Sequence, residues 1–261
     1  MNVNDSFPKK EIIAGWMRDI AVAGTFLTRL PFRPTPPLGI SSLGPSVQMF
    51  PIIGLIVGII GGVVLWMAAQ INLNPTAYGF LGLATVTLIT GALHEDGLAD
   101  FVDGICAYNR RRRLEIMRDS SIGVFGVLAL IFSIGLKVTL LGNLANPNLA
   151  VEALIAAAVI SRGMIPLLMY FLKPAQSDGL GHGAGRPSKD RMVTGLILSA
   201  VIAIILLDIG AAVSALFLSA LALSAVGWLA HRRLAGYTGD VLGAAQQCSE
   251  IAVLIVAGAI L

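Results

Sequence analysis

Ionisable side chains are concentrated in residues 94–103, a segment that directly follows an apolar run; they are His94, Glu95, Asp96, Asp100 and Asp103. If the segment is helical, the three aspartates are spaced i, i+4 and i+7, so they fall within an arc of about 60°. Three carboxylates on one face repel one another unless a cation neutralises them. Carboxylate oxygens suit Mg²⁺, which proteins often hold together with substrate phosphates. The segment is therefore a candidate metal and phosphate site.

A solvated acidic helix end at a membrane surface is the simpler interpretation of the same residues. The small residues Gly97, Ala99 and Gly104 favour the binding interpretation, because they would let another helix or a ligand come close to the carboxylates. His94 falls on the opposite side of the helix from the aspartates. A general base, a helix cap and a core histidine are all compatible with it.

Two later segments could complete such a site. The stretch 236–243 contains Asp240, which could serve as a fourth metal ligand. The glycine-rich stretch 178–186 could wrap a phosphate with its backbone amides, although glycine-rich loops are common.

Arginines follow the acidic segment closely. Arg118 and Asp119 lie just before another apolar run, and we predict that both contact substrate. The forked guanidinium of Arg118 could bind a phosphate beside the metal. The run 110–113 consists of four arginines, which are typical of a cytoplasmic loop and could also contact anionic lipids or substrate.

Two cationic side chains, Lys137 and Arg162, fall inside apolar runs. Charges at such positions are costly in a bilayer and are usually functional or paired. We predict that both contact substrate. The structural alternative is an ion pair of Lys137 with Glu152 or Asp208, although both acids fall near the opposite membrane face.

The elements that must position these residues are membrane helices. The 261-residue chain is 56% hydrophobic and 13% charged, with a mean hydropathy of +0.83. Its apolar residues gather in runs of about 20 residues, which is the length that crosses a bilayer. The predicted spans are 49–69, 77–93, 122–141, 150–172, 192–207 and 211–230, with a last polar loop at 231–249 and a short apolar tail.

The basic residues give these spans a direction. Sixteen of the eighteen Lys and Arg residues lie in the N-terminal segment and in the loops after the second, fourth and sixth spans. Cytoplasmic loops collect positive charge. The distribution therefore predicts that the N-terminus, the acidic segment and both later polar stretches are cytoplasmic.

The predicted fold is an all-α polytopic membrane bundle of about six to seven transmembrane helices that forms one catalytic domain. Residues 1–46 would form an interfacial helix and a linker, and residues 47–261 would form the bundle. Arg18 and Asp19 interrupt the apolar positions of the first helix, which suits a helix lying in the interface.

Four motifs together resemble the cobalamin synthase (adenosylcobinamide-GDP ribazoletransferase) family. They run through nearly the whole chain in the family's order: residues 26–31 (FLTRLP), 94–104 (HEDGLADFVDG), 114–120 (LEIMRDS, with Gly123 and Gly126) and 238–244 (TGDVLGA). Glu95 departs from the pattern, since many members carry an apolar residue there.

The resemblance implies a Mg²⁺-dependent phosphotransferase of the prokaryotic inner membrane with a cytoplasmic active site. The enzyme would transfer adenosylcobinamide phosphate from adenosylcobinamide-GDP to α-ribazole or its 5′-phosphate and release GMP. The metal ligands would be Asp96, Asp100 and Asp103, with Asp240 as a fourth ligand or behind them. Phosphate contacts would be Arg118 and Arg162, with Lys137 as a further candidate.

Two other functions remain as alternatives. A lipid CDP-alcohol phosphotransferase also uses spaced aspartates, but Tyr108 stands where its motif has an arginine. A cation transporter would place carboxylates near the bilayer midplane, whereas these cluster at one surface. The bilayer and the substrates are the expected partners. No nucleic acid is expected, and the sequence leaves the oligomeric state open.

Overall fold

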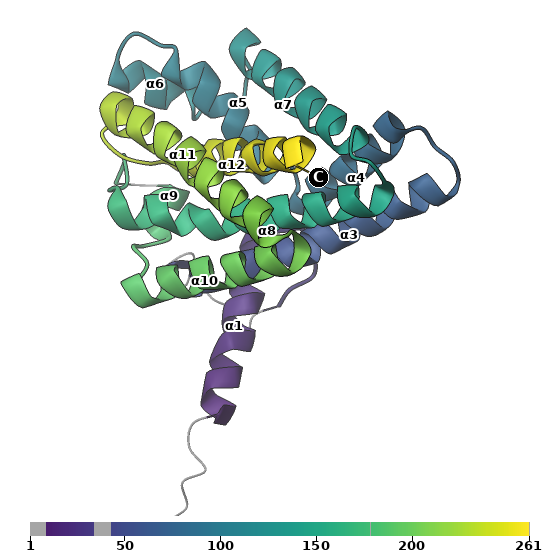
Figure 1. The fold of residues 1–261 in the computed structure, drawn as a ribbon. Helices are drawn as coiled ribbons and strands as arrows, with labels where there is room; N and C mark the ends of the chain where they lie inside the picture. Colours follow the sequence, from purple (N-terminus) through teal and green to yellow (C-terminus); the bar gives the residue numbers. More distant parts are fainter. Residues whose placement is uncertain (1–8, 34–42, 178, 261) are drawn as a thin grey trace, which may run out of the picture.

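The computed structural model describes residues 9–33, 43–177 and 179–260, which form helices and short connections without a β-strand. Figure 1 shows the arrangement. The helices are α1 (Lys9–Leu27), α2 (Leu43–Ser46), the 3₁₀ helix η2 (Val47–Met49), α3 (Phe50–Gln70), α4 (Pro75–Thr90), α5 (Leu93–Ile105), α6 (Arg110–Ile116), α7 (Val124–Gly142), α8 (Pro147–Phe171), α9 (Leu180–Gly183), α10 (Lys189–Leu206), α11 (Ile209–Leu234) and α12 (Gly239–Ile260).

The all-α membrane fold is confirmed. Five helical segments are long and apolar enough to cross a membrane: residues 43–70, 124–142, 147–171, 209–234 and 239–260. Helices α4 and α5 pass the same test only as a pair. Helix α10 covers the predicted span 192–207 but is not among these segments, and its first turn carries Lys189, Asp190 and Arg191.

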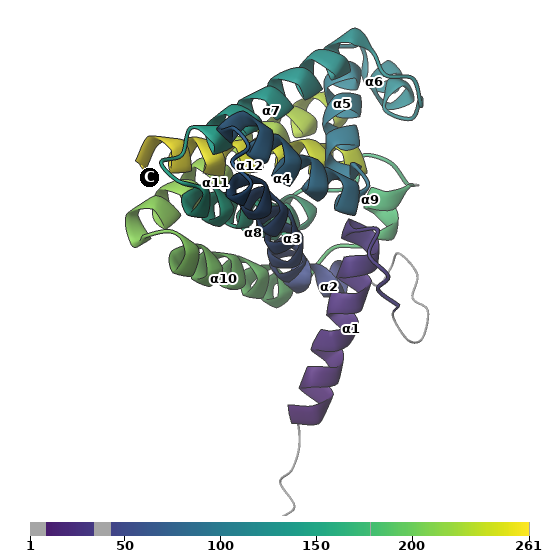
Figure 2. The same ribbon diagram turned by 90° about the vertical axis from the view of Figure 1, so that its right-hand side faces the viewer.

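Helices α8 and α12 form the centre of the bundle, with the other long helices around them (Figures 1 and 2). Within their most apolar windows, 83% of α8 and 72% of α12 is buried, against 28% of α7 and 33% of α11. Large apolar side chains such as Phe132, Ile205 and Phe217 are exposed on the outer helices. This is the pattern expected where lipid contacts the outer helices.

Glycines let α3 pack closely against α8. A Cβ added at Gly58 would lie 2.8 Å from the Cα of Ile155, and one added at Gly54 would lie 2.9 Å from the Cα of Val159. Neither position has room for a side chain, so glycine at both allows the two helices to approach closely.

The predicted last polar loop at 231–249 is wrong. Helix α11 continues to Leu234 and α12 begins at Gly239, so the connection is only four residues long. The polar residues Gln246, Gln247 and Glu250 misled the assignment. They lie on α12 and are buried inside the bundle.

Helix α1 projects from one side of the bundle in both views (Figures 1 and 2). Its exposed part includes Trp16 and Met17. It is anchored through Asp19, whose carboxylate accepts hydrogen bonds from Gln48 and Arg191. The interfacial position predicted for this helix stays a prediction.

A sharp bend separates α4 from α5 and sets the direction of the acidic segment. Gly91 and Ala92 both adopt left-handed backbone conformations, with φ of 64° and 57°. The two helix axes consequently differ by 88°. Such a conformation costs little for glycine but strains alanine. The bend carries α5 out of the direction of α4 and across α12.

Candidate active site

Helices α5 and α12 cross at a pair of glycines. A Cβ added at Gly97 would lie 3.1 Å from the Cα of Asp240, and one added at Gly243 would lie 3.1 Å from the backbone oxygen of His94. The backbones therefore approach as closely as glycine allows. This crossing brings Asp240 next to the acidic face of α5, although some 140 residues separate them in the chain.

Four carboxylates gather around this crossing, and we call Asp96, Asp100, Asp103 and Asp240 the carboxylate cluster. The side chains of Asp96, Asp103 and Asp240 all repel the charge on Asp100. Asp96 is exposed, whereas Asp100, Asp103 and Asp240 are half-buried. The predicted gathering of these four residues is therefore present in the structure.

Asp103 has an additional role that the sequence analysis missed. One of its oxygens accepts a hydrogen bond from the backbone amide of Gly123 at 2.7 Å, and the other accepts from Gly126 at 2.9 Å. A Cβ on Gly123 or Gly126 would collide with this carboxylate. Asp103 thus caps the N-terminus of α7, where a negative charge is favourable.

The carboxylates fit a metal that binds together with its substrate. Among the described residues, no group of three or more His, Cys, Asp or Glu side chains is arranged to hold an ion. Mg²⁺ is typically held by one or two carboxylates, several waters and substrate phosphates. Asp96 and Asp240 line one common cavity. The metal-ligand role of the cluster stays a prediction.

The first of two cavities at the crossing, which we call the apolar pocket, has a volume of about 120 Å³. Besides Asp96 and Asp240, its wall includes His94. His94 and Asp96 share the pocket because it covers the first turn of α5, so helical spacing does not separate them as predicted. Most of the wall is apolar and includes Phe26, Leu27, Phe50, Leu93, Ile165 and Met169, which come from α1, α3, α5 and α8.

His94 is only 3% exposed. Neither of its ring nitrogens has a hydrogen-bond partner in the part of the chain that the structure describes. It does not cap a helix, so the capping alternative is wrong. Its role as a base stays a prediction.

The second cavity, which we call the polar pocket, adjoins the first and also contains Asp240. Arg118 lies in its wall and donates two hydrogen bonds to Gln176 Oε1, at 3.2 and 2.7 Å. Residues of the predicted glycine-rich loop line it as well, as do Thr238 and Gly239. Thr238 Oγ1 donates to Asp240 at 3.1 Å. Arg118, the glycine-rich loop and Asp240 are thus brought together, as predicted.

Asp119 lies outside both pockets. Its carboxylate accepts a hydrogen bond from the backbone amide of Ser121 at 2.9 Å. This hydrogen bond holds the pKa of Asp119 below its usual value. Asp119 therefore stabilises the turn that leads into α7, and its predicted contact with substrate stays a prediction.

The arginine run divides into two pairs. Arg110 donates to the backbone oxygens of Leu234 and Ala175, and Arg113 donates to those of Ile105 and Arg233. The carbonyls of Arg233 and Leu234 lie at the C-terminal end of α11 and that of Ile105 at the C-terminal end of α5, where cations are favourable. Arg111 and Arg112 instead lie in solvent and pair with Glu115, which lowers the pKa of that carboxyl.

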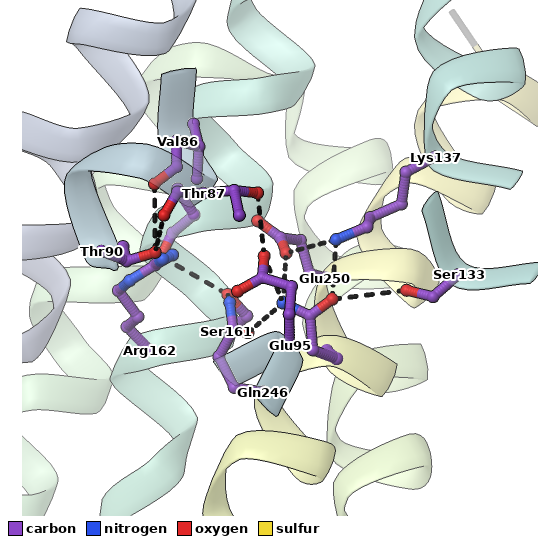
Figure 3. Close-up of polar contacts among 12 residues, drawn as sticks. Val86, Thr87, Thr90, Glu95, Ser133, Lys137, Ser161, Arg162, Gln246 and Glu250 are labelled. Carbon is purple, nitrogen blue, oxygen red and sulfur yellow. Dashed lines mark hydrogen bonds and ion pairs between the residues drawn. The ribbon is translucent and has the colours of Figure 1, made fainter. Parts of the chain in front are cut away.

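Lys137 and Arg162 lie inside the bundle, in what we call the buried charge cluster: Lys137, Arg162, Glu95 and Glu250 (Figure 3). These four residues are between 0% and 6% exposed. Lys137 Nζ lies 3.2 Å from Glu250 Oε2 and 2.7 Å from Gln247 Oε1. The proposed pairing with Glu152 or Asp208 is wrong. Asp208 caps α11 through Ala211, and Glu152 lines a separate surface cavity.

The buried charge cluster connects α5 to the neighbouring helices through Glu95. Glu95 Oε1 accepts hydrogen bonds from Thr87 at 3.2 Å and from Gln247 at 3.3 Å. Arg162 donates to the backbone oxygen of Ala158, and its Nε has no partner among the described residues. Glu95, which precedes Asp96, thus ties α5 to α4 and α12. Neither Lys137 nor Arg162 lines the apolar or the polar pocket.

Comparison with known proteins agrees with the motifs. A family model for cobalamin-5-phosphate synthase matches residues 19–258. The chain is 40% identical to the adenosylcobinamide-GDP ribazoletransferase of Bradyrhizobium diazoefficiens over 253 residues, which cover 97% of both chains. It is 41% identical to the enzyme of the same name from Mesorhizobium japonicum, over 92% of each chain.

A third relative with that name, from Azorhizobium caulinodans, is 41% identical over 92% of this chain and 94% of its own. No solved structure matches the chain. The matches favour neither the CDP-alcohol phosphotransferase nor the transporter alternative. Since the family model and these relatives extend over more than nine-tenths of the sequence, the chain belongs to the cobalamin-5-phosphate synthase family.

Proposed function

We propose that this protein transfers the adenosylcobinamide phosphate moiety from adenosylcobinamide-GDP to α-ribazole or its 5′-phosphate, with release of GMP. The product is adenosylcobalamin or its 5′-phosphate, so the reaction completes the nucleotide loop of the corrinoid. Membership of the family and the names of the relatives support this activity. The single observation that carries it is the junction of the apolar and polar pockets at Asp240, beside the carboxylate cluster.

The reaction requires two substrates to meet at one phosphorus atom. A ring hydroxyl of the ribose, which is free in both ribazole and its 5′-phosphate, attacks the phosphorus that carries cobinamide. The bond from that phosphorus to the bridging oxygen breaks, and GMP leaves with the electron pair. The hydroxyl loses its proton during the attack. Phosphoryl transfer depends mostly on positioning and on stabilisation of developing charge. Two adjoining pockets suit this requirement, since each can hold one reactant.

Arg118 is our candidate for the pyrophosphate contact. Its guanidinium already forms a forked pair of hydrogen bonds with one oxygen of Gln176 in the polar pocket. A phosphate oxygen could replace the amide oxygen in this geometry. The backbone amides of the glycine-rich loop would add further donors.

Mg²⁺ is our candidate cofactor, and it would neutralise charge on the pyrophosphate. Asp96 and Asp240 would hold it, because they line the pockets, and Asp100, whose charge interacts with both, would lie beside them. Asp103 would act by fixing α7 relative to α5. Lys137 and Arg162 would support the site through Glu95 and α5, without direct contact to the phosphates.

The apolar helices and the bacterial relatives indicate an integral membrane protein. We further propose the inner membrane, with the carboxylate cluster on the cytoplasmic side, because the Lys and Arg residues cluster around it. Cys106 tests this orientation, since it is exposed at the end of α5. A membrane-impermeant maleimide should label it in inside-out vesicles and not in spheroplasts. The reverse pattern would refute the orientation, with Cys106→Ala as the control.

The activity is tested with membranes that contain the protein, supplied with adenosylcobinamide-GDP and α-ribazole. We expect GMP release and a corrinoid product in the presence of Mg²⁺, and loss of both after chelation. Mg²⁺ added in excess should restore them. Absence of corrinoid product from correctly inserted protein would overturn the proposed activity, whereas full turnover after chelation would overturn only the role of Mg²⁺.

A further inference from the structure

The apolar pocket contains a polar group that the carboxylate cluster does not explain. His94 is almost completely buried, and neither ring nitrogen finds a partner in the described part of the chain. Buried polar groups normally have a hydrogen-bond partner, because an unpaired one costs free energy. A ligand that brings one complementary polar atom into this pocket would remove the cost.

The rest of the wall defines the kind of ligand. Aromatic and aliphatic side chains such as Phe26, Phe50, Ile165 and Met169 surround the imidazole. An apolar cavity of roughly 150 Å³ admits a benzene ring, so the 120 Å³ of the apolar pocket suits a flat aromatic group of similar size. A corrin macrocycle is several times larger than such a ring and cannot enter.

We propose that the apolar pocket binds the benzimidazole base of ribazole, and that His94 donates a hydrogen bond to the base's free ring nitrogen. This inference rests on the proposed function. Benzimidazole bound to ribose has one free polar atom on its rings, an acceptor. Among the described residues of the wall, His94 is the one side chain that can donate to it, because Asp96 and Asp240 offer carboxylate oxygens. Guanine presents several donors and acceptors, and an apolar wall would leave most of them unpaired.

The position of the pocket agrees with this assignment. Asp240 belongs to both pockets, so the ribose of a nucleoside bound in the apolar pocket extends to their junction. A ring hydroxyl of that ribose then reaches the phosphate held in the polar pocket. His94 is a binding residue in this arrangement, and it determines which bases are accepted.

The test compares two acceptors in two proteins. The acceptors are α-ribazole and the corresponding indole riboside, in which a C–H group replaces the free ring nitrogen. Wild-type protein should show a KM about tenfold higher for the indole riboside, the effect of one lost hydrogen bond. His94→Phe should raise the KM for α-ribazole about tenfold and should no longer distinguish the two acceptors.

Met169→Trp provides a second variant, because the larger side chain would fill the cavity. It should raise the KM for α-ribazole and leave the KM for adenosylcobinamide-GDP within about twofold of wild type, provided that the membranes contain equal amounts of protein. Conservative replacement by His94→Gln keeps a donor and should restore part of the discrimination between the acceptors.

Three results would overturn the assignment. The first is an equal increase of KM for both acceptors in His94→Phe, and the second is an increase of KM in that variant for adenosylcobinamide-GDP alone. The third is unchanged KM values in Met169→Trp. Failure of the proposed function itself would look different, because wild-type membranes would then release no GMP with any riboside.

Discussion

The carboxylate cluster and the buried charge cluster lie on the same two helices, α5 and α12, yet they treat charge in opposite ways. The first brings four acids together, and three of them repel the charge on the fourth, Asp100. The second balances two acids with two cations in a place that water does not reach. Like charges held together need a ligand, whereas opposite charges neutralise one another. The first arrangement is that of a binding site and the second that of a support.

Removal of one member of the carboxylate cluster should produce the largest loss of activity. We expect Asp100→Ala to lower the rate of GMP release by about 10³-fold, because the metal and pyrophosphate lose a central charge. Its thermal stability should not fall, since the substitution relieves repulsion with three other acids. GMP release and the melting temperature in detergent would be measured on the same preparation.

Asp119→Ala is the matched control, because Asp119 is an exposed acid outside both pockets. It should retain most of the activity. Near-normal turnover of Asp100→Ala would remove Asp100 from the site and erase the distinction between the two clusters.

Breaking the buried charge cluster should affect stability first. Lys137→Met leaves Glu250 buried without its nearest cation, which costs about 3–5 kcal/mol. For a chain of this size, the melting temperature should fall by roughly 10 °C. Thermal unfolding in detergent would measure the shift.

The double variant Lys137→Met/Glu250→Leu removes both charges and should recover at least half of the loss. The opposite pattern would support the prediction from the sequence that Lys137 contacts substrate. If Lys137→Met lost turnover with an unchanged melting temperature, Lys137 would contact substrate.

The smallest effects should separate the arginine run into its two pairs. Arg110→Ala leaves backbone oxygens of Leu234 and Ala175 without a donor, so we expect a loss of about 1–3 kcal/mol. Arg111→Ala breaks only a surface ion pair and should cost less than about 1 kcal/mol. The two melting temperatures would be compared directly. Equal shifts would show that the run acts as a whole through its charge.

The sequence predicts the fold well because membrane helices can be recognised from the length and hydropathy of their apolar runs. The predicted spans at 49–69 and 150–172 differ from α3 and α8 by at most three residues at either end. The acidic face of α5 also follows from spacing alone. The motif at 238–244 indicates Asp240 as a site residue. Its position next to α5 depends on the close approach of the two helices at Gly97 and Gly243, and no local sequence pattern predicts that approach.

The errors have a common physical origin. Gln246 and Gln247 favour a loop in the sequence, because polar residues rarely face the inside of a membrane helix. Gln247 and its neighbour Glu250 instead face Lys137 inside the bundle. Their partner Lys137 lies on another helix, so the pair becomes visible only in three dimensions. Asp103 was interpreted only as a ligand, although Gly123 and Gly126 indicated that something approaches the start of α7 closely.

Helix α12 has a consequence for biosynthesis. It carries Asp240 at its start and Glu250 near its middle, and it follows all the other described helices in the chain. Until the ribosome has delivered it, Lys137 lacks its counter-ion in the bilayer and α5 lacks the helix that it crosses. We therefore expect a chain that ends before α12 to lack both Asp240 and the acid that neutralises Lys137.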